Sequence, residues 1–98
     1  QFEVVWFGHI GDGNLHINIL KPDDMPQAGF VADCERVTKL LAGALQRHGG
    51  SISAEHGIGL VKRPYLGCTR SDAEIAAMRA IKAVFDPAGI MNPGKLFD

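Results

Sequence analysis

The sequence has no long hydrophobic run, no excess of one charge and few cysteines, and each of these absences excludes a class of protein. No apolar stretch approaches the roughly 18 residues that a membrane-spanning helix needs. The formal net charge is -1, which argues against nucleic acid or an anionic membrane surface as a partner. The two cysteines, Cys34 and Cys68, lack metal-binding spacing and indicate reduced thiols. We therefore expect a cytoplasmic protein, with a peripheral membrane location left open.

A glycine-rich stretch at residues 8–16 carries the main chemical information of the sequence. Its Asp-Gly step lies between two runs rich in β-branched and aromatic residues, which predicts a β-hairpin. Such a hairpin would bring His9, at the end of the first strand, back towards His16 in the second. Strict alternation puts His16 and Asn18 on one face, preceded there by Asn14, and apolar residues on the other.

The rest of the chain predicts an α+β protein of one small domain at most. The pattern predicts a long amphipathic helix over 29–47, a third strand over 51–54, a short helix over 60–66, and a helix that opens at a Ser71–Glu74 capping box and runs to about Phe85. So few strands leave unpaired sheet edges. We therefore expect a piece of a longer chain, and pairing of these edges between two copies in a homodimer.

Two histidines and a carboxylate form a candidate metal site. His9, His16 and Glu55 have the composition that zinc, manganese and iron sites use, with positions left open for water or substrate. Histidines near a hairpin are also common as ordinary polar surface residues, so spacing alone leaves both interpretations open. Glu55 and His56 are neighbours, and in an extended chain neighbours point to opposite sides. We therefore expect Glu55 to be a ligand and His56 to be an acid or base that faces the substrate.

Three blocks of sequence, at residues 8–16, 53–59 and 86–95, carry a family resemblance. In this order they resemble the C-terminal part of FAD-linked oxidases and dehydrogenases of the vanillyl-alcohol oxidase superfamily. Within it, the chain is most similar to FAD-dependent D-2-hydroxyacid dehydrogenases, a group that includes D-lactate and D-2-hydroxyglutarate dehydrogenases and the glycolate oxidase D subunit.

The resemblance implies a site that oxidises a small D-2-hydroxy acid to the 2-oxo acid with FAD and a divalent metal, usually zinc. It implies that His9, His16 and Glu55 hold the metal and that His56 is the base. Asn18 would lie beside the substrate, and Asn92 would reach the flavin.

The resemblance also implies a domain organisation. Residues 1–59 would be the C-terminal half of a partial ferredoxin-like cap domain, built from the hairpin, the long helix and the third strand. Residues 60–98 would be a helical segment that packs on an FAD-binding domain located elsewhere in the parent chain. FAD would be bound mainly by that domain, so the isolated piece is expected to be inactive.

Two alternatives remain at this point. One is another member of the superfamily that acts on a substrate without an α-carboxylate. The other is a stand-alone metal-binding or interaction module with a ferredoxin-like fold.

Overall fold

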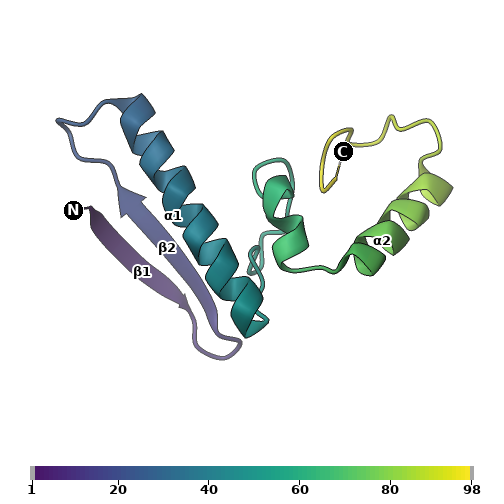
Figure 1. Cartoon of the computed structure of the whole chain (residues 1–98), viewed down its shortest axis with the longest axis horizontal. Coiled ribbons are helices and arrows are strands. Elements are labelled where there is room, and N and C mark those ends of the chain that lie inside the picture. Colours follow the sequence, from purple (N-terminus) through teal and green to yellow (C-terminus); the bar gives the residue numbers. More distant parts are fainter. Residues whose placement is uncertain (1, 98) are drawn as a thin grey trace. The chain divides into compact units, whose positions relative to one another are not determined.

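The computed structural model describes residues 2–97, which form two strands, two α-helices and one 3₁₀-helix (Figure 1). In chain order these are β1 (Glu3–His9), β2 (Asn14–Leu20), α1 (Gln27–His48), η1 (Arg63–Cys68) and α2 (Asp72–Phe85). A two-stranded antiparallel sheet together with helices confirms the predicted α+β class. Contacts divide the chain into two compact units, the first ending at Leu41 and the second beginning at Ala42, with the boundary inside α1.

The hairpin predicted around the glycine-rich stretch is present in the first unit. Its strands pair in antiparallel register over all seven residues of each, ending with His9 opposite Asn14. In the turn, the Asp12 carboxylate accepts a hydrogen bond from the Asn14 backbone N–H at 3.1 Å. Gly13 has a φ of 72°, a conformation that favours glycine. The turn chemistry therefore fixes which residues share each face of the sheet.

The strands of the hairpin leave large apolar side chains exposed. Trp6, Phe7 and Leu15 keep more than half of their surface accessible. The first unit also contains an edge-to-face contact between Phe2 and Phe30 of α1, with ring centroids 5.6 Å apart. Exposed apolar strands are typical of a sheet that another segment or another copy covers. The homodimer through sheet edges stays a prediction.

The predicted long helix is confirmed as α1, and it ends at the two glycines that follow it. The Gly49 N–H donates to the Gln46 carbonyl at 3.4 Å, and the Gly50 N–H donates to the Leu45 carbonyl at 2.8 Å. These are the two hydrogen bonds of a Schellman motif, and Gly49 takes the left-handed conformation that the motif needs, with a φ of 67°.

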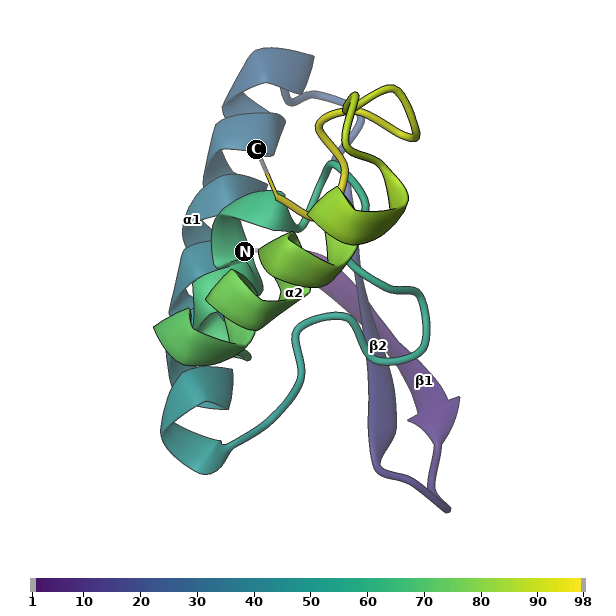
Figure 2. The same ribbon diagram turned by 90° about the vertical axis from the view of Figure 1, so that its right-hand side faces the viewer.

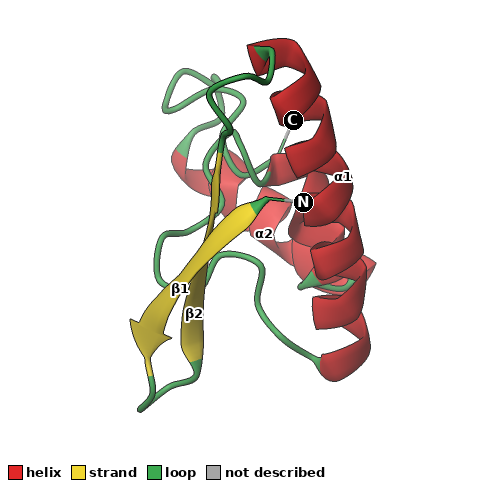
Figure 3. Ribbon diagram, turned by 90° about the vertical axis from the view of Figure 1, so that its left-hand side faces the viewer, coloured by secondary structure: helices red, strands yellow, loops and turns green. Residues whose placement is uncertain are grey.

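The third strand predicted over 51–54 is wrong: this segment is a series of bends and turns, drawn as loop in Figure 3. The Ser51 hydroxyl accepts a hydrogen bond from the Ser53 N–H at 3.4 Å, a local bond that competes with strand pairing. Ala54 has a φ of 48°, which turns the chain, and the His56 N–H closes the turn on the Ser53 carbonyl at 2.9 Å.

The second unit contains the end of α1, the loop that follows it, η1, α2 and the C-terminal segment, which leaves α2 as an irregular loop (Figure 2). The short helix predicted over 60–66 is present as η1, displaced towards the C-terminus. The capping box is confirmed: the Ser71 hydroxyl accepts from the Glu74 N–H, and the Glu74 carboxylate accepts from the Ser71 N–H. The Ser71 backbone N–H, with a smaller contribution from the Ser71 side chain, holds the pKa of the Glu74 carboxyl below its usual value. Leu66 and Phe97 are buried in this unit.

Candidate metal centre and catalytic residues

The two histidines predicted as metal ligands lie on the same face of the hairpin. His16 is opposite Phe7 and His9 is opposite Asn14, so the histidines occupy diagonal positions. Diagonal residues of an antiparallel pair are roughly 7–8 Å apart, which lets two imidazole rings lean towards one point. The His16 ring stacks on Phe7 with centroids 4.9 Å apart and planes 6° apart. The hairpin therefore orients the His16 ring and brings both histidines to one face, as the sequence predicts.

Two asparagines belong to the same face. Asn18 follows His16 by two residues in β2 and is exposed. Both polar side-chain atoms of Asn14 are buried, and neither has a hydrogen-bond partner within residues 2–97. Buried polar atoms normally have a partner, so this amide is suited to bind a polar ligand. The sequence placed Asn14 on this face but gave no reason to distinguish it from an ordinary turn residue.

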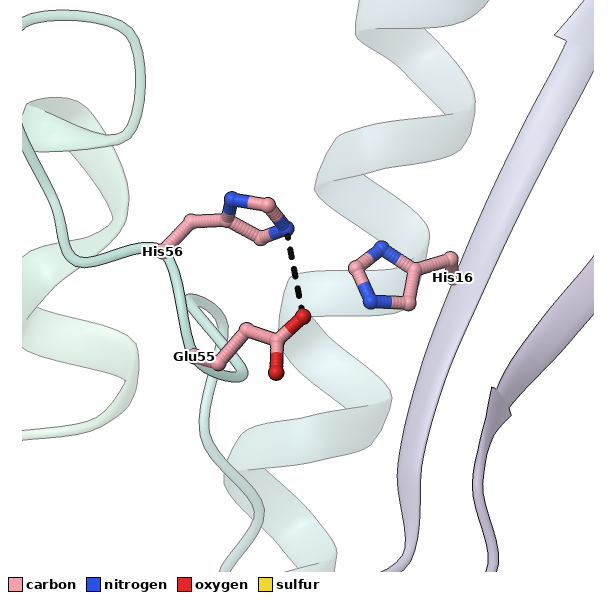
Figure 4. A group of neighbouring side chains, drawn as sticks. All are labelled: His16, Glu55 and His56. Carbon is pink, nitrogen blue, oxygen red and sulfur yellow. Dashed lines mark ion pairs between the residues drawn. The ribbon is translucent and has the colours of Figure 1, made fainter.

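In the second unit, Glu55 and His56 lie in the loop after α1 and their side chains approach each other. Glu55 Oε1 is 3.8 Å from His56 Nε2, and Figure 4 marks this ion pair in a view that also draws His16. The prediction that these neighbours point to opposite sides is wrong, because the backbone here turns at Ala54 instead of running extended. Both side chains are exposed, so a carboxylate and an imidazole are presented together to a ligand.

Asn92 lies in the C-terminal segment after α2 and is exposed. Its φ of 47° is a left-handed conformation that asparagine tolerates better than most residues. The residues before it are held by Asp86, whose carboxylate accepts hydrogen bonds from the N–H groups of Ile90 at 3.0 Å and Met91 at 2.9 Å. Asp86 also pairs with Lys82, and this bond holds the pKa of Asp86 below its usual value, helped by the two backbone N–H groups.

Asn92 lines a pocket of about 390 Å³ within the second unit. The lining also includes the cationic side chains of Arg79, Lys82 and Lys95. Arg79 lies over the ring of Phe97, with its guanidinium carbon 4.9 Å from the ring centroid. Asp86, which pairs with Lys82, also lines the pocket, so Arg79 and Lys95 supply its excess positive charge. An amide beside this excess of positive charge suits an anionic group.

The chain thus combines an α+β fold with imidazole and carboxylate donors of the kinds that divalent metals use. It belongs to the family of FAD linked oxidases, C-terminal domain, whose model matches residues 1–96. The predicted family resemblance is therefore confirmed.

Three relatives illustrate the match. The chain is 72% identical over 98 residues to a D-2-hydroxyglutarate dehydrogenase of Xanthomonas citri pv. viticola, covering 100% of this chain and 21% of that protein. It is 62% identical over 97 residues to a D-2-hydroxyglutarate dehydrogenase of Stutzerimonas stutzeri, covering 99% and 21%. It is 43% identical over 104 residues to glycolate oxidase subunit GlcD of Bacillus subtilis, covering 99% and 20%. The chain spans about a fifth of the length of these relatives.

The residues present fit both groups that the family implies. His9 and His16 offer imidazole nitrogens and Glu55 offers a carboxylate oxygen, which are donor types that divalent metals use. The unpartnered amide of Asn14, opposite His9 in the sheet register, fits a polar ligand on the histidine face.

None of the helices within residues 2–97 combines the length and the apolar character that a membrane span needs.

Proposed function

We propose that this chain is the metal-bearing part of a flavin-dependent oxidoreductase that oxidises a D-2-hydroxy acid to the corresponding 2-oxo acid. The observation that carries this proposal is the family match over residues 1–96, joined to relatives of 72% and 62% identity that are named D-2-hydroxyglutarate dehydrogenase. These two names make D-2-hydroxyglutarate the first substrate to test.

In this proposal His9, His16 and Glu55 hold a divalent metal, with zinc as the first ion to test. A bound metal of this kind would polarise the hydroxyl group and fix the carboxylate of the substrate. Asn18, exposed on the histidine face, hydrogen-bonds the substrate beside the ion. Asn14 offers the same face a second amide, and the absence of a hydrogen-bond partner for its side chain among residues 2–97 supports that role.

His56 is the proposed base. Its imidazole takes the proton of the substrate hydroxyl, and general-base catalysis of this kind contributes about 10²–10⁴-fold in rate. A bound flavin would supply the acceptor for the hydride from Cα, which carries two electrons and one proton. The second proton, from the hydroxyl group, goes to His56 as the C–O bond becomes a carbonyl. The contact between Glu55 and His56 supports a role for the carboxylate in orienting the imidazole.

The remaining roles concern the rest of the protein. We propose that residues 1–59 belong to a cap domain that binds substrate, and that residues 60–98 pack on a separate FAD-binding domain. Asn92 and the pocket that it lines, which has more cationic than acidic side chains, support a contact with FAD from the second of these segments. FAD is then bound mainly outside this chain, and the isolated chain is inactive.

The test uses the full-length protein that contains this chain. We would measure metal content by elemental analysis and turnover of D-2-hydroxyglutarate with an artificial electron acceptor, for His16→Ala, His56→Asn and the matched control His48→Ala. His48 ends α1 and has no part in the proposed site. We expect His16→Ala to lose the metal and the activity, His56→Asn to keep the metal and lose activity at least 100-fold, and His48→Ala to keep both.

Two other results would change the assignment. Loss of the metal in His56→Asn would make His56 a ligand and not the base. The metal content of this variant must be measured because the His56 ring lies close to Glu55, a proposed ligand. A wild-type protein that binds metal but oxidises none of the D-2-hydroxy acids would contradict the proposed function and favour a metal-binding module.

A further inference from the structure

The segment that carries Asn92 is anchored on both sides by specific hydrogen bonds. Before it, Asp86 accepts from the N–H groups of Ile90 and Met91, and the Lys82 ammonium donates to the Met91 carbonyl at 2.6 Å. The backbone on that side is therefore tied to the end of α2. Asn92 itself stays exposed, so the anchors fix its position without covering it.

After Asn92, the anchors come from the segment that follows Glu55 and His56. Arg63 Nη1 donates to the carbonyl of Gly94 at 2.8 Å, across 31 residues of sequence. The Leu96 N–H donates to the carbonyl of Gly59 at 2.9 Å. These bonds join η1, which follows the loop of the proposed base, and Gly59 near the end of that loop to the segment of the proposed flavin contact, and all of them lie within the second unit.

Arg63 and Leu60 are the side chains next to Gly94, at ordinary van der Waals distance from an added Cβ atom. Gly94 has a φ of 72°, and a Cβ atom built on it would lie 3.4 Å from Arg63 Nη1 and 3.9 Å from a methyl carbon of Leu60. The hydrogen bond from Arg63 to the Gly94 carbonyl is partly buried. A guanidinium bonded to a carbonyl in this setting limits the orientations of the segment more than a flexible ammonium would.

We propose that Arg63 is a positioning residue that sets the placement of the Asn92 segment relative to the Glu55–His56 loop. The inference rests on the proposed function, in which His56 takes a proton from the substrate and Asn92 contacts the flavin. Hydride transfer requires the substrate carbon and the flavin to meet within a narrow range of distance and angle. Arg63 would hold the two protein segments that define this meeting, although it touches neither substrate nor flavin.

The test compares Arg63→Met, Arg63→Lys and the control Arg70→Met in the full-length, flavin-loaded protein. Methionine keeps much of the stem of the side chain and removes every donor, whereas lysine keeps the charge and one ammonium donor group. Arg70 is an exposed arginine whose ion pair with Glu74, at 3.8 Å, lies away from the Asn92 segment in sequence. It therefore controls for the loss of one arginine from this unit.

The first readout is hydrogen–deuterium exchange of the peptide that covers residues 90–97. We expect exchange of its protected amides to accelerate at least tenfold in Arg63→Met and to stay at the wild-type rate in Arg70→Met. Unchanged exchange in Arg63→Met would overturn the proposal, because the Arg63 bond would then not hold the segment.

The second readout separates positioning from general stability. Per bound flavin, we expect Arg63→Met to lower kcat about 10–100-fold with KM and metal content within twofold of wild type, because misplacement by about 1 Å can cost 10²-fold. The kinetic isotope effect with Cα-deuterated substrate should rise as hydride transfer becomes slower. A fall in flavin or metal content with kcat per site unchanged would overturn the proposal, because it would mean a structural role only.

Arg63→Lys keeps the test decisive if Arg63→Met does not fold. Its kcat should lie between those of wild type and Arg63→Met, at least threefold below wild type, and a wild-type kcat would overturn the proposal. The failure of the proposed function is distinguishable, because in that case the wild-type protein itself would oxidise no D-2-hydroxy acid. The exchange experiment would still report whether Arg63 anchors the segment.

Discussion

Gly8 is the glycine at which a single added methyl group should do most damage to the hairpin that carries both histidines. A Cβ atom built on Gly8 would lie 1.8 Å from the backbone oxygen of Asn14, whereas real Cβ atoms essentially never approach closer than 3.0 Å. The strands must therefore separate by about 1 Å next to His9, and neither partner in the clash is a flexible side chain. Loss of two ladder hydrogen bonds at about 1 kcal/mol each gives a destabilisation of the hairpin of about 2 kcal/mol.

We expect Gly8→Ala to weaken zinc binding by the full-length protein about 30-fold, which is the equivalent of that 2 kcal/mol, because closing the site must restore the hairpin. Gly11→Ala is the matched control: it lies in the turn of the same hairpin, and its Cβ would meet nothing within 4 Å. The assay is a zinc competition titration against a chelator, with Tm measured in parallel. Equal zinc affinity and equal Tm for the two variants would refute the reasoning.

Three further predictions concern stability. Ser71→Ala removes the hydroxyl acceptor of the capping box, keeps the backbone N–H that donates to Glu74, and should cost about 1 kcal/mol, seen as a lower urea midpoint. An unchanged midpoint would show that the hydroxyl contributes nothing to the cap. The pKa of Asp86 is lowered in the fold, so its ionised form stabilises the protein above about pH 4 and this stability is lost as pH falls through the lowered pKa. Asp86→Asn should therefore be less stable than wild type at pH 7, by a difference that shrinks in acid; a difference independent of pH would contradict this. Ala54→Val places a β-branched residue at a φ of 48° and should lower stability by about 1 kcal/mol relative to Ala54→Gly. The measurement is the urea midpoint of each variant, and the opposite order of midpoints would argue against strain at this residue.

The parts of the fold that the sequence predicted correctly are those encoded by neighbouring residues. The Asp-Gly step specifies the hairpin turn, two glycines end α1, and Ser71 with Glu74 begins α2. The third strand failed because a strand needs a partner, and no segment within residues 2–97 pairs with residues 51–54. The anchoring of the C-terminal segment was also missed, since the bond from Arg63 to Gly94 joins residues whose types give no indication of it.

The arrangement of Glu55 and His56 leads to the last prediction. The rule that neighbouring side chains point to opposite sides holds for extended backbone. The chain turns here because Ala54 is left-handed, a conformation too uncommon for alanine to be expected from sequence.

A carboxylate has two oxygens, so Glu55 can hold an ion with one and orient the His56 imidazole with the other. On this argument, Glu55→Gln should lower kcat about tenfold even at zinc concentrations that fill the site, because an amide orients the base less firmly than a carboxylate does. The measurement is kcat per bound zinc, with Glu35→Gln, a helical carboxylate outside the proposed site, as the control. A wild-type kcat per bound zinc in Glu55→Gln would mean that Glu55 acts on the metal alone and that His56 is positioned by other contacts.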